Sequence, residues 1–259
     1  MLRTSRSTAA ASRASHTTAA RPATRTSNIT LRGTPVPARA HPCPGTPGTA
    51  QIVVLDGTAI ATPEHYRAWG ADLRALGFTH LRTGALAPRQ SGQAERAGLR
   101  CVQELALLDI DAPFAIGAIE HRTHRLRQHE LGHLAEIDLA AFGAHWALDA
   151  EMLADIRRAT PAHRARTARV DGAVAGFLVS GRAGRTGYVQ RLAVHPSAQR
   201  HGLATALLLD SLRWMRRTRV RRAFVNTHVE NEAALELYRR HGFVELPERL
   251  RVHEGPIPT

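Results

Sequence analysis

The spacing of apolar and polar residues predicts an α/β protein whose regular elements begin near residue 50. The pattern predicts a strand, a helix, a strand, a helix and a strand, at residues 51–55, 63–76, 79–83, 90–97 and 102–110. Thr62 can cap the first helix and Pro63 suits its first turn, while Gly98 ends the second helix. These elements form a small α/β unit over residues 51–112.

Residues 121–259 repeat this order on a larger scale. The pattern predicts strands at residues 124–128, 164–170, 173–180, 187–195, 220–226 and 243–252, and helices at residues 131–142, 149–160, 201–217 and 231–241. Asp171-Gly172 signals a hairpin turn, and residues 181–184 form a looser one. Strict alternation along strand 187–195 would place four side chains on one face: Tyr188, Gln190, Leu192 and Val194.

The two parts share an internal echo. Thr83 precedes Gly98 by the same interval as Thr227 precedes Gly242, and each glycine closes a helix that is followed by a strand. Residues 51–112 are therefore either a degenerate copy of the second half of the fold or a convergent strand–helix–strand unit.

The first 50 residues have no hydrophobic period. They are rich in Ser, Thr, Ala and Pro and contain arginines without any acidic residue. This composition predicts a disordered tail and linker over residues 1–50. A targeting segment or a start codon placed too far upstream would have the same composition.

The formal net charge is +13, and all 35 basic residues are arginine. An absence of lysine is typical of a GC-rich genome rather than of a phosphate-binding surface, so nucleic acid is not the expected partner. No apolar run is long enough to span a bilayer. Cys43 and Cys101 are isolated, which favours a reducing compartment and a cytoplasmic protein.

The strongest chemical signal follows the strand at 187–195. Pro196 ends this strand, and residues 197–204 run directly into a helix. Such a loop presents unpaired backbone N–H groups at a helix N-terminus, where the helix dipole also attracts an anion. Gly202 lets a phosphate approach the backbone closely, and Ala204 keeps the next turn small.

Two motifs in this order resemble the GNAT superfamily of acyl-coenzyme A N-acyltransferases. Residues 199–204, Gln-Arg-His-Gly-Leu-Ala, fit the signature Q/R-x-x-G-x-G/A, and residues 231–243 resemble the second motif, with Asn231, Tyr238 and Gly242-Phe243. The resemblance covers residues 121–253 and is greatest to ribosomal-protein N-acetyltransferases. It implies a mixed, mostly antiparallel sheet flanked by helices, with the smaller N-terminal α/β unit before it.

The resemblance also implies roles for individual residues. The co-substrate would be acetyl-coenzyme A, whose pantetheine arm would pair with the backbone of Leu192, Ala193 and Val194. Asn231 would hydrogen-bond the cofactor, and Tyr238 would protonate the departing thiolate. The pyrophosphate would lie against the loop and the first helical turn, formed by Gln199, Arg200, His201, Gly202, Leu203, Ala204 and Thr205.

The acceptor implied is a primary amine, either a small molecule or a protein N-terminus or side chain, which attacks the thioester directly. Phe142 and Trp146 would border its site. Tyr188, Gln190 and Asn226 stand where many members carry a glutamate, and none of them is a base near neutral pH. His228, His145 and Glu230 are the candidates for that role, directly or through water.

Other interpretations stay open at this stage. His129-Glu130-Leu-Gly-His133 reads HExxH, the pattern of zinc hydrolases, although Gly132 weakens a helix there and the acyltransferase reading needs no metal. The arginine-rich stretch 216–222 could bind nucleic acid or simply end a helix. The N-terminal unit could shape the acceptor site or mediate a homodimer.

Overall fold

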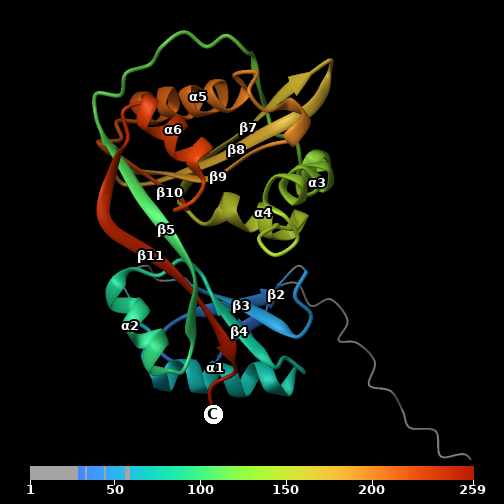
Figure 1. Cartoon of the computed structure of the whole chain (residues 1–259), viewed down its shortest axis with the longest axis vertical. Coiled ribbons are helices and arrows are strands. Elements are labelled where there is room, and N and C mark those ends of the chain that lie inside the picture. Colours follow the sequence, from blue (N-terminus) through green and yellow to red (C-terminus); the bar gives the residue numbers. More distant parts are fainter. Residues whose placement is uncertain (1–28, 33, 44, 56–58) are drawn as a thin grey trace, which may run out of the picture.

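The computed structural model describes residues 29–32, 34–43, 45–55 and 59–259 and shows a mixed α/β fold (Figure 1). Its strands form one sheet in the order β1-β2-β3-β4-β11-β5-β10-β9-β8-β7-β6. The strand bounds are β1 Ile29–Leu31, β2 Ala38–Pro42, β3 Thr49–Val54, β4 His80–Thr83, β5 Arg100–Asp111, β6 Thr123–Arg125, β7 Ala162–Val170, β8 Ala173–Ala183, β9 Thr186–Val194, β10 Arg222–His228 and β11 Val244–Pro256. The predicted mixed and mostly antiparallel sheet flanked by helices is confirmed.

The helices lie where the apolar spacing predicted them. Their bounds are α1 Pro63–Ala75, α2 Pro88–Arg96, α3 Leu131–Phe142, α4 Ala150–Arg158, α5 Leu203–Arg217 and α6 Glu232–Arg240, with short 3-10 turns η1 Gln128–Glu130 and η2 Pro196–Ala198. α5 packs on one face of the C-terminal strands through Leu207, Leu208 and Leu212. α3 and α4 cover the opposite face through residues such as Leu134 and Leu153.

Two copies of one motif are arranged about the centre of the sheet. The first repeat runs β3-α1-β4-α2-β5 and the second runs β9-α5-β10-α6-β11. In each repeat the first two strands are parallel, and the last strand pairs with the other repeat: β5 with β10, and β11 with β4. Figure 1 shows β5 and β11 passing side by side between the halves. Each repeat therefore completes the sheet of the other.

The ends of α2 and α6 confirm that the sequence echo is structural. Gly98 and Gly242 follow these helices with φ of +91° and +86°, a backbone conformation that favours glycine. The next residue donates its N–H back into the helix in both cases, from Leu99 to Ala94 O and from Phe243 to Tyr238 O, at 3.1 Å each. This is the same Schellman ending in both repeats.

The predicted linker up to residue 50 needs correction. β1 and β2 lie within residues 29–42 and extend the sheet beyond β3. Leu31, Ala38 and Ala40 are buried there in the core of the N-terminal half. Alanine is a weak hydrophobic marker, which hid these strands from the sequence pattern. The rest of the predicted tail, residues 1–28, lies outside the described residues.

Candidate active site

The site begins where the two parallel strands of the second repeat separate. β9 and β10 pair from Thr186 and Arg222 up to Val189 and Val225. Both strands continue beyond this point without pairing with each other, to Val194 and His228. β8 occupies the other edge of β9. The edge of β9 that faces the gap therefore presents free N–H and C=O groups to an extended ligand.

A β-bulge at Gln190 coincides with this separation. Val189 pairs with Ser180 and Arg191 pairs with Val179, so the register with β8 skips Gln190. The bulge reverses the alternation that the sequence predicted. Tyr188 shares a face with Arg191 rather than with Leu192 and Val194, because an inserted residue moves every later side chain to the other face.

A cavity of about 1000 Å³ occupies the gap. Most of the residues predicted for the site line it: Phe142, Trp146, Gln190, Leu192, Ala193, Val194, Gln199, Arg200, Gly202, Leu203, Ala204, Thr205, Asn226, His228, Asn231 and Tyr238. His201 and Tyr188 do not line it, and the expectation for Tyr188 is corrected. Its ring is exposed and stacks on Phe224, with centroids 6.2 Å apart.

One end of the cavity is an uncapped helix N-terminus. Gly202 is the N-cap of α5 with φ of +77°, and no side chain caps this helix. The first N–H groups of α5 therefore remain available to a ligand. Gln199 fixes the loop to the end of β9, because its Nε2 donates to Val194 O at 3.1 Å. A Cβ atom on Gly202 would lie 3.3 Å from Nε2 of His121, so the loop is closely covered.

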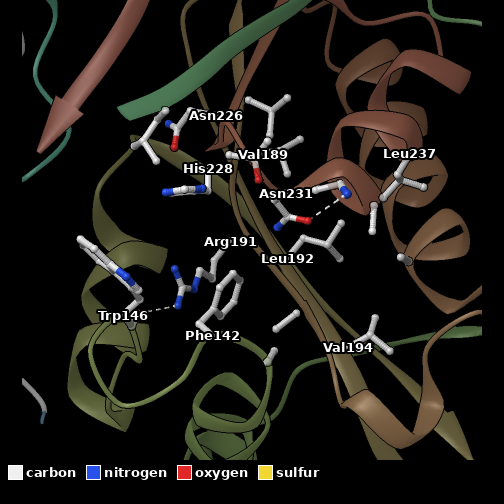
Figure 2. Close-up of a pocket in the computed structure, with 18 of the residues that line it drawn as sticks. Phe142, Trp146, Val189, Arg191, Leu192, Val194, Asn226, His228, Asn231 and Leu237 are labelled. Carbon is white, nitrogen blue, oxygen red and sulfur yellow. Dashed lines mark hydrogen bonds between the residues drawn. The ribbon is translucent and has the colours of Figure 1, made fainter. Parts of the chain in front are cut away.

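α6 contributes two polar side chains to the middle of the cavity. Asn231 caps the helix through Oδ1, which accepts from Ala234 N at 3.1 Å, and its amide NH₂ is left for a ligand (Figure 2). Tyr238 is buried and packs edge-on against Phe243. Burial raises the pKa of the Tyr238 hydroxyl, although the charge of Arg191 opposes the shift. The hydroxyl therefore stays protonated near neutral pH and can act as a proton donor.

The other end of the cavity is organised by Arg191. Its guanidinium donates to both carboxylate oxygens of Asp138, at 2.7 and 2.6 Å, and to Trp146 O at 2.9 Å. It also lies over the Phe142 ring, 3.6 Å from the centroid. Figure 2 shows Arg191 between Trp146 and Phe142. Asp138 further accepts from Leu148 N at 2.8 Å, so one buried carboxylate holds the whole α3–α4 connection.

We expect Asp138→Ala to lower the free energy of unfolding by about 3 kcal/mol, because it leaves the partly buried Arg191 charge unpaired and removes the acceptor of Leu148 N. Urea denaturation would measure this change. Glu64→Ala is the matched control, since the Glu64–Arg67 pair is exposed and its loss should change the stability far less. Equal effects of the two substitutions would contradict a structural role for the Asp138 pair.

The three candidate bases are placed unequally. His228 and His145 line the cavity and Glu230 does not. Nδ1 of His228 accepts from Glu230 N at 3.1 Å, so a neutral ring carries its proton on Nε2. Nε2 of His145 accepts from Nη2 of Arg82 at 2.6 Å. In both imidazoles the lone pair of the neutral ring is already used.

Sequence reasoning missed the residues that line the cavity from the first repeat, among them Gln51, Arg82 and Gln103. It also missed Arg191. An arginine in a predicted strand could have been noted, but its orientation depends on the bulge. The contribution of the first repeat depends on β11, which joins β4 to β5 across the sheet.

The residues of the HExxH motif make structural contacts. Its residues are divided between η1 and α3. Glu130 is buried, accepts from Arg127 N at 2.7 Å and forms an ion pair with Arg169. His133 contacts Glu136 through Nδ1 and Val174 O through Nε2, at 3.0 Å each. The described part of the chain contains no cluster of three metal-ligating side chains, and the zinc interpretation is unsupported.

The arginine-rich stretch 216–222 is also explained by the fold. It spans the last turn of α5 and the start of β10. Arg222 forms an ion pair with Asp109 on β5 and lies near Asp111. The nucleic-acid interpretation is therefore unsupported.

No helix in the described ranges has the length and apolar character needed to cross a bilayer.

The cavity thus joins a splayed strand pair to an uncapped helix N-terminus, an arrangement that suits an extended ligand with an anionic end. Residues 127–243, a little under half of the chain, match the sequence model of the acetyltransferase (GNAT) family, and this match supports acyl transfer. Comparison with curated proteins gives no match.

Solved structures share the fold over both repeats. A tandem GNAT protein from the clavulanic acid biosynthesis pathway is similar with a TM-score of 0.60 and 16% identity, over 86% of this chain and 79% of that one. A GCN5-related N-acetyltransferase from Kribbella flavida gives 0.60 and 14%, over 90% of each chain. One from Sphaerobacter thermophilus gives 0.57 and 17%, over 86% and 77%. The tandem architecture is thus found in a solved relative of this fold.

Proposed function

We propose that the protein transfers an acetyl group from acetyl-coenzyme A to a primary amine. The observation that carries the proposal is the continuity of the cavity. The unpaired edge of β9, the uncapped N-terminus of α5 and the buried hydroxyl of Tyr238 all line one space. This space offers a strand edge to an amide-bearing arm, N–H donors to a diphosphate, and an acid to a leaving thiolate.

The residues that line the cavity can be assigned to successive parts of acetyl-coenzyme A. The backbone of Leu192, Ala193 and Val194 would hydrogen-bond the two amides of the pantetheine arm. The diphosphate would be held by N–H groups of the first turn of α5 and its preceding loop, where Gly202 has no Cβ to obstruct it. The Asn231 amide would donate to the arm between these positions. Arg200 and Arg240, which also line the cavity, suit the anionic end of the ligand.

The reaction would proceed by direct attack within a complex of both substrates. The nitrogen lone pair of the amine forms a bond to the acetyl carbonyl carbon, and collapse of the tetrahedral intermediate breaks the C–S bond. The Tyr238 hydroxyl donates its proton to the departing thiolate, the attacking nitrogen loses its extra proton to water, and the Tyr238 phenolate regains a proton from water, so that the products are the amide and the coenzyme A thiol. A free N–H of β9 next to the bulge would stabilise the oxyanion, as backbone donors do in acyl transfer.

The proton on the acceptor ammonium has to leave before the attack. His145 and His228 already use their lone pairs, and the lining contains no unpaired carboxylate in the described residues. The acceptor would therefore react as the free amine that is present at equilibrium, and its proton would pass to water. Attack by the free amine would need no general base, which agrees with the lack of the glutamate that many members of the family carry.

Calorimetry and a thiol-release assay test the proposal. We expect the protein to bind one acetyl-coenzyme A per chain, and to release free coenzyme A thiol when a suitable amine is added. Competition by desulfo-coenzyme A would show that binding depends on the diphosphate and arm. The proposal fails if well-folded protein takes up no acetyl-coenzyme A. Binding without release of thiol for any amine would indicate a binding module instead.

A further inference from the structure

The first repeat lacks the cofactor-binding groups of the second. Counting back from Gly98 and Gly242, Ala87 takes the place of Asn231, and the buried Ala94 takes the place of Tyr238. At the N-terminus of α1, Pro63 supplies no N–H, and Thr62 N donates to Nδ1 of His65 at 3.0 Å. These donors are absent or occupied, so the first repeat cannot hold a diphosphate as α5 can.

The first repeat instead turns one face of its strands toward the cavity. α1 and α2 cover the face that carries Ala50, Ile52 and Leu81. The opposite face carries Gln51 and Arg82, which are paired in register on β3 and β4. Both line the cavity, as does Gln103 on β5. The first repeat is therefore one wall of the space beyond the acyl position.

Arg82 joins this wall to the α3–α4 connection. Its side chain is 2% exposed and forms an ion pair with Glu254 on β11 at 2.5 Å. Nη1 donates to His145 O at 2.9 Å, and Nη2 lies 2.6 Å from Nε2 of His145. The guanidinium also lies 4.9 Å from the centre of the Trp146 ring. Arg82 thus positions His145 and Trp146, two aromatic side chains at the acceptor end.

The charged side chains at the acceptor end of the cavity are held in ion pairs. Arg82 is paired with Glu254 and Arg191 with Asp138. His145 stays neutral, because burial and the Arg82 charge lower its pKa. Among the residues that line the cavity, Glu236 is the one carboxylate, and it lies on α6 with Arg240 bound at 2.5 Å. A substrate with several positive charges would find no free counter-charge here.

Three of the remaining uncharged polar groups are carboxamides. Gln51, Gln103 and Asn226 line the cavity from β3, β5 and β10. Their side chains make no hydrogen bond to another described residue. A carboxamide can both donate and accept, which suits amide or hydroxyl groups on a ligand. Aromatic walls, balanced charges and free carboxamides together select an uncharged body.

We propose that the first repeat is the acceptor-binding half of the active site, and that it selects primary amines attached to an uncharged, amide-bearing body. Arg82 is the positioning residue that holds the acceptor wall in place and keeps its charge balanced with Glu254. This proposal rests on the proposed acetyl transfer at the same cavity. It assigns a function to the part of the chain outside the family match at 127–243.

An acceptor panel tests the selectivity of the wild-type protein. Alaninamide and a neutral tripeptide amide, each with a free amino group, are compared with spermidine and with glutamate at a fixed acetyl-coenzyme A concentration. We expect the neutral amides to give the highest kcat/KM. Faster turnover of spermidine or glutamate, or no turnover of the neutral amides by protein that binds acetyl-coenzyme A, overturns the proposal. Failure to bind acetyl-coenzyme A would instead refute the acetyl transfer itself.

Two substitutions that change the net charge in opposite directions test the wall formed by the first repeat. Arg82→Gln leaves Glu254 unpaired and should shift the preference toward spermidine by about tenfold in kcat/KM. Glu254→Gln leaves Arg82 unpaired and should shift it toward glutamate by a similar factor. The double variant should restore the preference for neutral amides. The affinity for acetyl-coenzyme A should stay unchanged in all three variants, because neither residue contacts the α5 terminus.

The pattern across these variants separates charge selection from a structural role. A merely structural Arg82 would lower turnover of every acceptor alike and would not be rescued by Glu254→Gln, and that result overturns the proposal. If Arg82→Gln fails to fold, Glu254→Gln alone still has to produce the shift toward glutamate. An unchanged preference in that variant also overturns the proposal.

Discussion

Gly202→Val should weaken acetyl-coenzyme A binding by about 100-fold or more, on the order of 3 kcal/mol. Gly202 has φ of +77° at the N-cap of α5, and a Cβ there would already lie 3.3 Å from the ring of His121. A branched side chain would strain this backbone and fill the space through which a phosphate approaches the N–H groups. Calorimetric titration with acetyl-coenzyme A measures the loss.

Gly98→Val is the matched control for backbone strain. Gly98 follows the C-terminal end of α2 with φ of +91°, and an added Cβ would meet no heavy atom within 4 Å. This variant should lose stability comparable to that of Gly202→Val and should still bind acetyl-coenzyme A. Undiminished binding by folded Gly202→Val protein would remove the diphosphate site from the account.

Tyr238→Phe should lower kcat by about 100-fold, the contribution typical of a positioned general acid. The substitution removes one oxygen and leaves the ring packed against Phe243, so the fold should be retained. Since the hydroxyl acts on the leaving thiolate, the affinity for acetyl-coenzyme A should remain unchanged. Steady-state thiol release and calorimetry, performed together, separate these two quantities.

Tyr66→Phe controls for the loss of a buried phenol elsewhere. Tyr66 lies in the core of the first repeat, where burial raises the pKa of its hydroxyl to about 12. It does not line the large cavity. Its substitution should leave kcat unchanged. A similar kcat for wild type and Tyr238→Phe would mean that water protonates the thiolate and that Tyr238 only packs.

Local sequence accounts for most of the secondary structure. The helix predicted over 131–142 has these bounds in the structure, and the turn predicted at Asp171-Gly172 joins β7 to β8 with φ of 49° and 82°. These features depend on residues that are close in sequence. β1 and β2 were missed because both strands are short and most of their buried residues are alanine. Their burial depends on the sheet that they join.

The sequence also located the part of the cavity that is proposed to hold the cofactor. The loop before α5 and the motif from Asn231 to Phe243 are contiguous, and a helix N-terminus exposes its N–H groups wherever the chain places it. The strand alternation failed at Gln190, because a bulge is a property of two paired strands. For this reason Tyr188 was misassigned and Arg191 was missed.

The sequence by itself predicted the helices, the strands from residue 51 onward, the echo between the two parts and the loop before α5, since each depends on short-range spacing, capping and glycine conformation. The tertiary structure decided the wall that is proposed to bind the acceptor. Arg82 and Glu254 meet because β11 pairs with β4, and Arg191 reaches Asp138 because the bulge turns it toward α3. Such contacts join residues far apart in the chain, and their geometry follows from sheet register and packing.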